Sequence, residues 1–376
     1  MQGFRLGSIS GFEIRVDLSW LLIFFLVLWT LSAGLFPATY PGLANTTYFG
    51  MGLVATLLFF ASLLAHELSH SFVARAKGIP VEGITLFIFG GVSRTRMDAE
   101  TPGDEFQIAI VGPLTSVLLA GFFGLIWYIG INAGWSVVVT GIASYLASIN
   151  LVLAIFNMLP GFPLDGGRVF RSLIWKYTGD QRKATQIAST GGKWLGFLVI
   201  ALGIWQMFNY AILGGLWFIL IGWFLYNAAE ASYEELLLRT SLKGVRAREI
   251  MTPYPEIVSA DLTLQELVDK YFLSRRYQSF PVIQDGQPVG IITLSQIRDI
   301  PREEWVYRTV QDTMMPTDQG VTARPEEQMS QVLEKMQESS VRRVLVIQNG
   351  LLQGIITAND IARWLQRQRE FGHQMG

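Results

Sequence analysis

Two histidines and a glutamate stand close together at the end of a long apolar run. The stretch LLAHELSHSFVARAKG, residues 63–78, places His66 and His70 four residues apart, with Glu67 between them. On a helix, residues four apart share one face, so both imidazoles can reach one metal ion while Glu67 reaches an adjoining water. Neutral imidazole suits Zn²⁺, and a catalytic zinc usually takes three protein ligands and one water. The spacing therefore predicts a metal site that needs a third ligand.

Asp165 is the best candidate for that third ligand. It lies in NMLPGFPLDGGRV, residues 157–169, after a proline-rich break in an apolar segment. A metal held by this aspartate and the histidine pair would lower the pKa of a bound water, and Glu67 could take its proton to create a nucleophile for a peptide carbonyl. Asn157 could donate a hydrogen bond to the developing oxyanion. The alternatives are that Asp165 is a turn residue and that Asn157 makes a helix C-terminal or an interhelical hydrogen bond.

These residues belong to a chain with the composition of a membrane protein. It has 376 residues, of which 51% are hydrophobic and 16% are charged; an ordinary soluble domain has about 25% charged residues. Apolar runs near the roughly 20 residues that cross a bilayer predict six transmembrane helices, at about 18–36, 49–74, 105–130, 136–158, 190–208 and 211–228. The net charge of -1 gives no reason to expect nucleic acid as a partner. Because cysteine is absent, disulfides and thiolate ligands are excluded.

The positions of Lys and Arg set the orientation of these spans in the lipid bilayer. Basic residues precede the first span and follow the second and fourth, while the three opposite connections contain none. The positive-inside rule therefore predicts that both chain ends, and both halves of the candidate metal site, face the cytoplasm. The segment VEGITLFIFGGVS, residues 81–93, is too short to cross. It would form either a re-entrant hairpin beside a hydrated site or an interfacial loop.

The motifs resemble those of the site-2 proteases, intramembrane zinc metalloproteases that cut transmembrane helices of other proteins. AHELSHSFVARAKG is similar to the metal helix of that family, FIFGGVSR to its re-entrant segment, AIVGPLTS to its third core helix and NMLPGFPLDGGRV to its second metal motif. The resemblance covers residues 1–228 and implies one zinc per chain, bound by the two histidines and Asp165. It also implies that Glu67 is the catalytic base and that Asn157 stabilises the substrate or the oxyanion.

The C-terminal third of the chain contains an internal repeat with a spacing of 64 residues. FPVIQDGQPVGIITLSQIRDI, from residue 280, matches VLVIQNGLLQGIITANDIARW, from residue 344. Each copy reads as strand, turn, strand and helix, with hairpin turns at Asp285-Gly286 and Asn349-Gly350. The predicted organisation is a six-helix membrane domain (1–228), an amphipathic linker helix (229–243), two repeats (244–307 and 308–368) that pack as one soluble α/β module, and a tail (369–376).

The repeat resembles a pair of CBS (cystathionine-beta-synthase) domains, which often bind adenine nucleotides between the two copies. In that family a G-x-x-T/S-x-x-D stretch places a hydroxyl and a carboxylate near the ribose and phosphate. The second copy matches through Thr357 and Asp360, whereas the first has Gln296 where the aspartate would be. The resemblance thus implies one site for ATP, ADP or AMP, and a homodimer formed through the CBS domains. The alternative is a nucleotide-free module for dimerisation or tethering.

Together these features predict regulated intramembrane proteolysis by a multi-pass protein of a prokaryotic plasma membrane. The substrate would be a transmembrane protein, such as a membrane-tethered regulator, and nucleotide binding would change substrate access. Two competing functions are a CBS-containing ion transporter or channel and an inactive relative that binds membrane partners. The ionisable groups gather at one end of the spans, which disfavours a conduit, and the intact HELSH and LDGG stretches disfavour an inactive relative.

Overall fold

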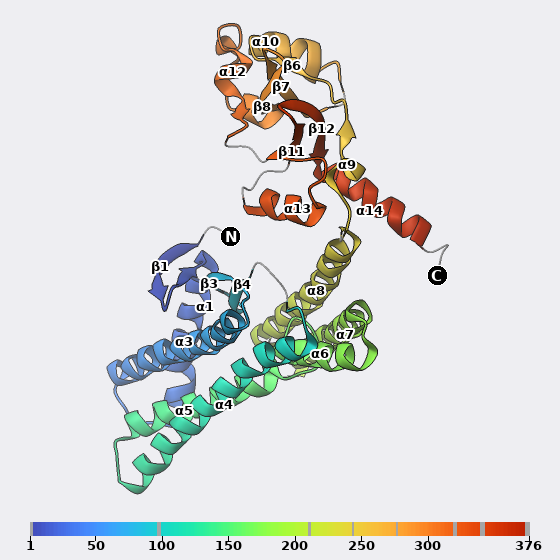
Figure 1. Ribbon diagram of the computed structural model, residues 1–376. Helices are drawn as coiled ribbons and strands as arrows, with labels where there is room; N and C mark the ends of the chain where they lie inside the picture. Colours follow the sequence, from blue (N-terminus) through green and yellow to red (C-terminus); the bar gives the residue numbers. More distant parts are fainter. Residues whose placement is uncertain are drawn as a thin grey trace. The chain divides into compact units, whose positions relative to one another are not determined.

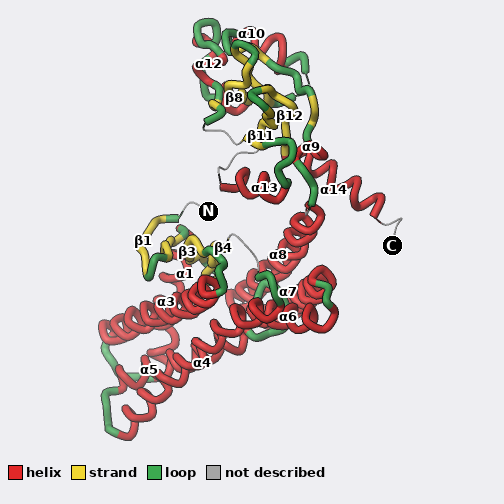
Figure 2. Tube along the Cα trace, in the orientation of Figure 1, coloured by secondary structure: helices red, strands yellow, loops and turns green. Residues whose placement is uncertain are grey.

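The computed structural model describes residues 3–95, 99–209, 212–242, 244–275, 277–318, 322–338 and 343–372. The chain divides into two compact units, Met1–Glu234 and Glu235–Gly376. Long helices dominate the first unit, and short strands and helices build the second (Figures 1 and 2). Residues 373–376 of the predicted tail lie outside the described residues.

The first unit contains the candidate membrane helices. The helical elements are α1 (Leu18–Trp29), a π-helical turn (Thr30–Leu35), α2 (Phe36–Thr39), α3 (Asn45–Ala76), α4 (Pro102–Asn132), α5 (Val137–Asn157), α6 (Asp165–Thr178), α7 (Gln181–Asn209) and α8 (Ile212–Leu242). Within the described residues, the segments long and apolar enough to cross a membrane are Leu18–Thr39, α3, α4, α5 and α7. These five coincide with the first five predicted spans. The sixth predicted span falls on α8, and the six-span topology stays a prediction.

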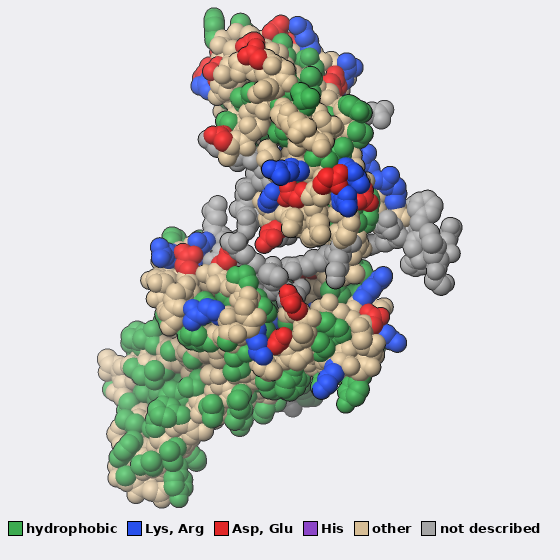
Figure 3. Space-filling view, viewed as in Figure 1, with side chains coloured by type: hydrophobic (Ala, Val, Ile, Leu, Met, Phe, Trp, Pro, Cys, Tyr) green, Lys and Arg blue, Asp and Glu red, His purple; other side chains and the backbone are tan. Residues whose placement is uncertain are grey.

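The outer surface of these helices is apolar, as contact with lipid requires. On α4, Leu118 is 66% exposed and Phe122 is 57% exposed, and on α7 Trp194 is 69% exposed. Hydrophobic side chains are spread over α4 and α5 in the space-filling view (Figure 3). Monomeric soluble proteins rarely expose large contiguous apolar patches. The first unit is therefore a membrane domain.

A four-stranded sheet accompanies these helices, in the order β1-β2-β3-β4. Its strands are β1 (Phe4–Ile9), β2 (Phe12–Val16), β3 (Val81–Phe87) and β4 (Gly90–Thr95). The apolar segment 81–93 is therefore part of a β-hairpin, and its depth in the bilayer stays a prediction. Sequence reasoning assigns no strands before the first span, although β1 and β2 form a local antiparallel hairpin with positive φ at Ser10 and Gly11. β2 gains a second, parallel partner from β3, far along the chain.

The sheet packs on the helix that carries the histidine pair. Its buried cluster consists of Ile14, Val16, Ile84 and Leu86, with Trp20, Leu64 and Leu68 packed against it. Leu64 lies two residues before His66 on α3, and Leu68 lies between His66 and His70. The hydrophobic contact that holds the sheet therefore also brings β4 beside this helix. The position of the hairpin thus follows from burial of alternate strand residues on one helix face.

The second unit contains two four-stranded sheets that repeat one another. Its strands are β5 (Thr252–Pro253), β6 (Val258–Ser259), β7 (Ser279–Gln284), β8 (Gln287–Thr293), β9 (Met315–Pro316), β10 (Thr322–Ala323), β11 (Arg343–Gln348) and β12 (Leu351–Thr357). Its α-helices are α9 (Ala247–Ile250), α10 (Leu264–Leu267), α11 (Leu294–Arg298), α12 (Val310–Thr313), α13 (Met329–Glu338) and α14 (Ala358–Gly372). The sheet orders are β6-β7-β8-β9 and β10-β11-β12-β5. Because β5 lies in the first repeat (244–307) but pairs with β12 of the second, the two repeats interlock.

The predicted hairpin turns of both copies are confirmed. Asp285 and Gly286 have φ values of 51° and 79°, and Asn349 and Gly350 have values of 52° and 77°. Positive φ at both central residues is the type I′ geometry that Asp-Gly and Asn-Gly favour. α8 extends to Leu242 and so includes nearly all of the predicted linker helix, and Leu242 is fully buried in the core of the second unit.

Close packing of α7 on α8 depends on glycines, which gives a testable prediction. A Cβ at Gly203 would lie 2.7 Å from the carbonyl oxygen of Gly215 and 2.8 Å from the backbone nitrogen of Ile219. Because backbone atoms cannot move aside as a side chain can, Gly203→Ala should lower the free energy of unfolding by about 1–3 kcal/mol. Thermal unfolding in detergent measures the change.

The matched control is Gly121→Ala on α4, where an added Cβ meets no heavy atom within 4 Å. Alanine favours helix by up to about 1 kcal/mol over glycine, so this control should unfold at the same or a slightly higher temperature. Equal unfolding temperatures for the Gly203 variant and the wild type would contradict the close packing of α7 on α8.

Candidate functional site

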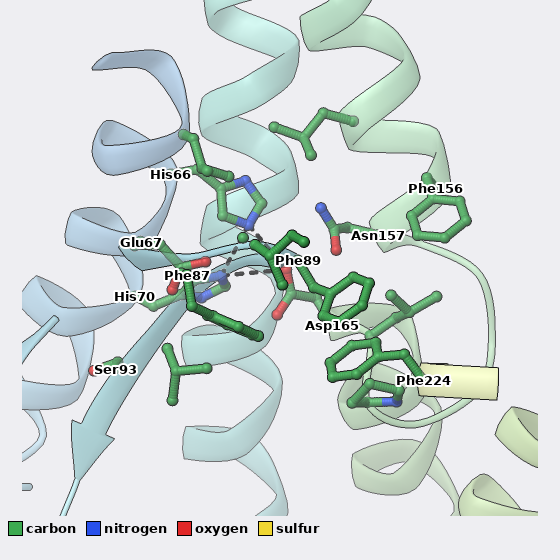
Figure 4. A pocket seen from close by; sticks show the side chains of 18 of the residues that line it. His66, Glu67, His70, Phe87, Phe89, Ser93, Phe156, Asn157, Asp165 and Phe224 are labelled. Atoms are coloured by element: carbon green, nitrogen blue, oxygen red, sulfur yellow. Dashed lines mark hydrogen bonds and ion pairs between the residues drawn. The ribbon is translucent and has the colours of Figure 1, made fainter. Parts of the chain in front are cut away.

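The two predicted histidine ligands lie on the same buried face of α3. His66 is 2% exposed and His70 is 7% exposed. Glu67, the residue after His66, lines a cavity beside them. Asp165 is the first residue of α6, and its side chain points at the histidine pair (Figure 4). The structure thus brings the Asp165 carboxylate to two histidines that lie 99 and 95 residues earlier in the chain.

The geometry of these three side chains suits a tetrahedral metal. Asp165 Oδ2 lies 3.1 Å from His66 Nε2 and 3.2 Å from His70 Nε2, and the two Nε2 atoms are 3.2 Å apart. Ligand atoms of a tetrahedral zinc with bonds of about 2.0–2.1 Å are separated by about 3.3–3.4 Å. His66, His70 and Asp165 also form the metal-compatible cluster found within the described residues.

The hydrogen bonds of the imidazoles support this reading. His70 Nδ1 lies 2.5 Å from the carbonyl oxygen of Ile108, and His66 Nδ1 lies 2.9 Å from Ser116 Oγ. A carbonyl can only accept, so Nδ1 of a neutral His70 carries the proton and Nε2 presents its lone pair. Lone pairs of two imidazoles and a carboxylate repel one another unless a cation lies between them. The donor set therefore fits Zn²⁺, with α4 orienting both rings.

A glycine on α4 makes room for the two rings. A Cβ at Gly112 would collide with His70 Nε2 and would lie 2.7 Å from His66 Nε2. Sequence reasoning noted AIVGPLTS as a family likeness but gave Gly112 no role. The signal available was a Gly-Pro pair inside an apolar span, where such residues are costly unless packing demands them.

The segment between α5 and α6 places Asp165. The backbone nitrogen of Phe162 donates to the carbonyl oxygen of Ala188 at 3.2 Å, and Gly161 packs so closely on Gly192 that a Cβ there would lie 2.6 Å from it. This segment is therefore held against α7 by a backbone hydrogen bond and by close contact. Because α6 begins directly after this segment, its contacts with α7 also hold the Asp165 carboxylate in place.

The proposed ligands open into a cavity of about 530 Å³. Besides those ligands it is lined by Glu67, Asn157, Arg168, the β4 segment 90–93 and apolar residues of α1, α3, α5 and α8. Phe89 at the hairpin turn stacks on Phe224 of α8 with ring centroids 4.1 Å apart, and both rings border the cavity (Figure 4). The surroundings are thus largely apolar, with the ionisable groups gathered at one place.

Glu67 and Asn157 both face this cavity. Gly91 of β4 packs on Glu67, and a Cβ there would lie 2.5 Å from the Glu67 Cγ. Asn157 is the last residue of α5 and is half-buried. Within the described part of the chain its amide has no hydrogen-bond partner, so the alternative of an interhelical bond finds no support there. The predicted catalytic residues therefore border the same space as the proposed ligands.

The second unit has a pocket of about 420 Å³ that is lined by Asp360, one of the two predicted nucleotide residues. Asp360, 5% exposed, accepts hydrogen bonds from the backbone nitrogen and Oγ1 of Thr357 at 2.8 and 2.6 Å, and from Thr252 Oγ1 at 2.9 Å. Arg363 pairs with Asp360 at 2.5 Å. The Thr357–Asp360 pair thus caps α14. Of the two residues, Asp360 lines the pocket.

The equivalent pair of the first copy has the same capping role. Gln296 Oε1 accepts from the backbone nitrogen of Thr293 at 2.8 Å and from its Oγ1 at 2.7 Å. The T-x-x-D/Q pattern is therefore explained in both copies by helix capping. What distinguishes the second copy is the negative charge of its carboxylate and the pocket beside it.

Family models match both units of the chain. The model for peptidase family M50 matches residues 54–133 and 125–202, and the CBS domain model matches residues 247–303 and 310–367.

Several curated proteins are similar along nearly the whole chain. Rip3 of Mycobacterium tuberculosis, named as a zinc metalloprotease, is 36% identical over 95% of this chain and 91% of its own length. The Synechocystis protein sll0528, also named as a zinc metalloprotease, is 37% identical over 96% of this chain and 95% of its own length. Zinc metalloprotease MJ0392 of Methanocaldococcus jannaschii is 32% identical over 96% of this chain and 95% of its own length.

Solved structures resemble each unit separately. The site-2 protease from Methanocaldococcus jannaschii is 29% identical, with a TM-score of 0.43, and covers 62% of this chain and 95% of that chain. The CBS domain of a bacterial CNNM/CorC family Mg²⁺ transporter in complex with ATP is 23% identical, with a TM-score of 0.31, and covers 35% of this chain and 97% of that chain.

Removal of one proposed ligand tests the metal site. Asp165→Ala should weaken zinc binding by more than about 100-fold, because loss of a direct ligand exceeds the roughly 10–100-fold cost of losing an outer partner. Ser116→Ala keeps all three ligands and removes only the partner of His66 Nδ1. Its zinc affinity should therefore fall by roughly 10–100-fold. Zinc content by elemental analysis and competition with a chelator give the affinities. Unchanged zinc affinity in Asp165→Ala would exclude this carboxylate as a ligand.

Proposed function

Since this chain belongs to peptidase family M50 and carries a pair of CBS domains, we propose that it cuts peptide bonds within membrane-spanning segments of other proteins, in regulated intramembrane proteolysis. It is a zinc metalloprotease of the site-2 protease type. The observation that carries the proposal is the meeting of two imidazole nitrogens and one Asp165 oxygen beside Glu67, in a cavity walled by membrane helices. One zinc per chain is expected.

The residues around the cavity divide the chemistry of peptide hydrolysis between them. Zinc held by the three ligand side chains would supply Lewis-acid chemistry to the scissile carbonyl. Glu67 takes a proton from the attacking water and passes it to the leaving amine. The amide of Asn157, which has no other partner in the described part of the chain, donates to the developing oxyanion. Packing of Gly91 against Glu67 keeps its carboxylate at the cavity edge.

The substrate must lose its helical structure before it is cut. In a helix each peptide carbonyl is hydrogen-bonded to the chain and shielded by side chains. Unpaired backbone groups are tolerated at membrane depth only where protein or water satisfies them. A cavity that gathers Glu67, Asn157 and Arg168 among apolar walls offers such partners to a short unwound segment. A single membrane-spanning segment of another protein is therefore the proposed substrate class.

The topology proposed for the protein follows from its basic residues. Arg and Lys beside the spans favour a multi-pass protein with both termini in the cytoplasm, and the prokaryotic plasma membrane is the proposed location. Cleavage near the cytoplasmic end would release a soluble fragment from a membrane-tethered regulator. An ion transporter or channel is not favoured, because the ionisable residues that line the cavity gather around the histidine pair.

The CBS domains are proposed to bind one adenine nucleotide (ATP, ADP or AMP) and to change substrate access, with a homodimer as the assembly. The pocket beside α14 offers Asp360 to ribose hydroxyls and the guanidinium groups of Arg363 and Arg367 to phosphate. Gln296 gives the first copy a neutral amide at the equivalent place, so a single site is proposed.

Replacement of the proposed base tests the catalytic role. Glu67→Gln keeps the shape of the side chain but cannot take a proton, so cleavage of a transmembrane substrate should fall by about 10²- to 10⁴-fold. Zinc content should stay at the wild-type level, which separates loss of the base from loss of the metal. Single-turnover cleavage in detergent or proteoliposomes measures the rate. A rate within a few-fold of wild type would refute the role of Glu67 as the base.

Two variants of the second CBS copy test nucleotide binding. Asp360→Asn and Arg363→Gln should each weaken ATP binding by about 10-fold or more, because each removes a charged partner of the ligand. Asparagine keeps an oxygen that can cap α14, so the fold is preserved. Gln296→Ala, at the equivalent position of the first copy, is the control and should bind ATP as the wild type does. Equal ATP affinity in all three variants would place the nucleotide elsewhere or exclude it.

A further inference from the structure

A buried ion pair joins α4 to α6 and is not used by the chemistry described above. Glu105, in the first turn of α4, is 0% exposed, and Arg171 on α6 is 8% exposed. Arg171 Nε donates to Glu105 Oε1 at 2.6 Å, and Arg171 Nη2 donates to the same oxygen. Arg168, one turn earlier on α6, has its Nε 3.9 Å from that oxygen. One carboxylate therefore holds the face of α6 that carries both guanidinium groups.

The two helices that this pair connects each control one part of the proposed metal site. Ile108, one turn after Glu105, supplies the carbonyl oxygen that accepts from His70 Nδ1 at 2.5 Å. α6 begins at Asp165, whose Oδ2 lies 3.2 Å from His70 Nε2. The ion pair thus closes a loop of contacts that runs from α4 through His70 and Asp165 along α6 and back to α4.

The arginine also contacts the segment that leads into α6. The Arg171 Cζ lies 5.1 Å from the centre of the Phe162 ring, and Phe162 is three residues ahead of Asp165. A guanidinium over an aromatic face is attracted by the ring. Both the segment before Asp165 and the helix after it are therefore anchored to the same charged group.

Stability alone gives a poor account of this pair. Removing two charges from water is costly, and well-packed apolar residues of similar volume often stabilise a protein as well or better. Here the cost is not fully offset, because Glu105 Oε2 is buried and has no hydrogen-bond partner in the described part of the chain. A bidentate-capable guanidinium does, however, define direction and distance more strictly than apolar packing.

We propose that Glu105 and Arg171 are positioning residues, whose ion pair sets the separation between the Asp165 carboxylate and the histidine pair and thereby holds the zinc geometry. This inference rests on the proposed zinc site. The ion pair affects the affinity and the geometry of zinc binding. Neither Glu105 nor Arg171 contacts the substrate in this role.

The test compares Glu105→Gln, Arg171→Met and the double variant, all as full-length protein in detergent. The half-life of bound zinc under excess chelator reports metal retention, the visible absorption of the Co²⁺-substituted protein reports ligand geometry, and thermal unfolding reports stability. All three variants should release zinc about 10–100-fold faster than wild type and show an altered Co²⁺ spectrum, since outer partners of metal ligands have effects of this size.

The double variant separates positioning from stability. Each single variant leaves a buried polar or charged group without its partner and should unfold at a lower temperature, whereas the double variant removes the uncompensated charge and should recover most of that loss. Fast zinc release that persists in the stable double variant supports the inference. Recovery of zinc retention together with stability overturns it, because the pair would then act only through the fold. If the single variants do not fold, the double variant alone decides.

Asp104→Asn is the matched control for Glu105→Gln. Asp104 precedes Glu105 on α4 and pairs with Lys77 at 2.9 Å, with both side chains about 30% exposed. Exposed pairs of this kind contribute little, so zinc release from this variant should equal that of wild type. If the wild type contains zinc and the Glu105 and Arg171 variants retain it equally well, only the positioning role is overturned. A wild-type protein without zinc would overturn the proposed metal site itself, and the inference with it.

Discussion

Mutual repulsion among three metal-ligand atoms is the constraint on which the membrane unit depends. Two imidazole nitrogens and a carboxylate oxygen lie within 3.2 Å of one another in a largely apolar setting. Such an arrangement is unfavourable without a cation. Hydrogen bonds at the Nδ1 atoms of both imidazoles oppose any movement of the rings that would separate the three atoms. The proposed zinc therefore compensates a polar cluster that the helices hold in place.

α4 holds this cluster although it supplies no ligand. It offers the Ile108 carbonyl and the Ser116 hydroxyl to the two rings, and Gly112 leaves the space in which their Nε2 atoms meet. Through Glu105 the same helix also holds α6 and so the third proposed ligand. An outer shell of this kind fixes the tautomer and direction of each ligand, which is how a protein tunes a metal.

The CBS unit follows a different organising rule, which is exchange of short strands between its copies. β5 of the first repeat pairs with β12 of the second, and β9 of the second repeat pairs with β8 of the first. Each sheet is therefore completed by a short strand from the other repeat. Thr252, beside β12, also bonds to Asp360 and so brings the start of the module to the pocket. Each repeat therefore needs the other to complete its sheet, and residues of both line the pocket at Asp360.

The sequence by itself determined the parts of this protein that rest on local spacing. The four-residue interval of the histidines, the lengths of five apolar spans, the 64-residue repeat and the two hairpin turns all follow from helix period, bilayer thickness and the φ preferences of Asn, Asp and Gly. Asp165 could be named as a candidate ligand because it follows a proline-rich break at the end of the fourth predicted span, on the same predicted membrane side as the histidine pair. Its alternative as a turn residue stayed open.

Only the tertiary structure decided which distant groups meet. The parallel pairing of β2 with β3, the space left by Gly112, the hydrogen bond from His70 to Ile108 and the burial of Glu105 against Arg171 depend on contacts between segments far apart in the chain. Residue types at those positions carry no periodic signal, because a carbonyl, a missing Cβ and a single carboxylate acquire their roles only from what packs against them.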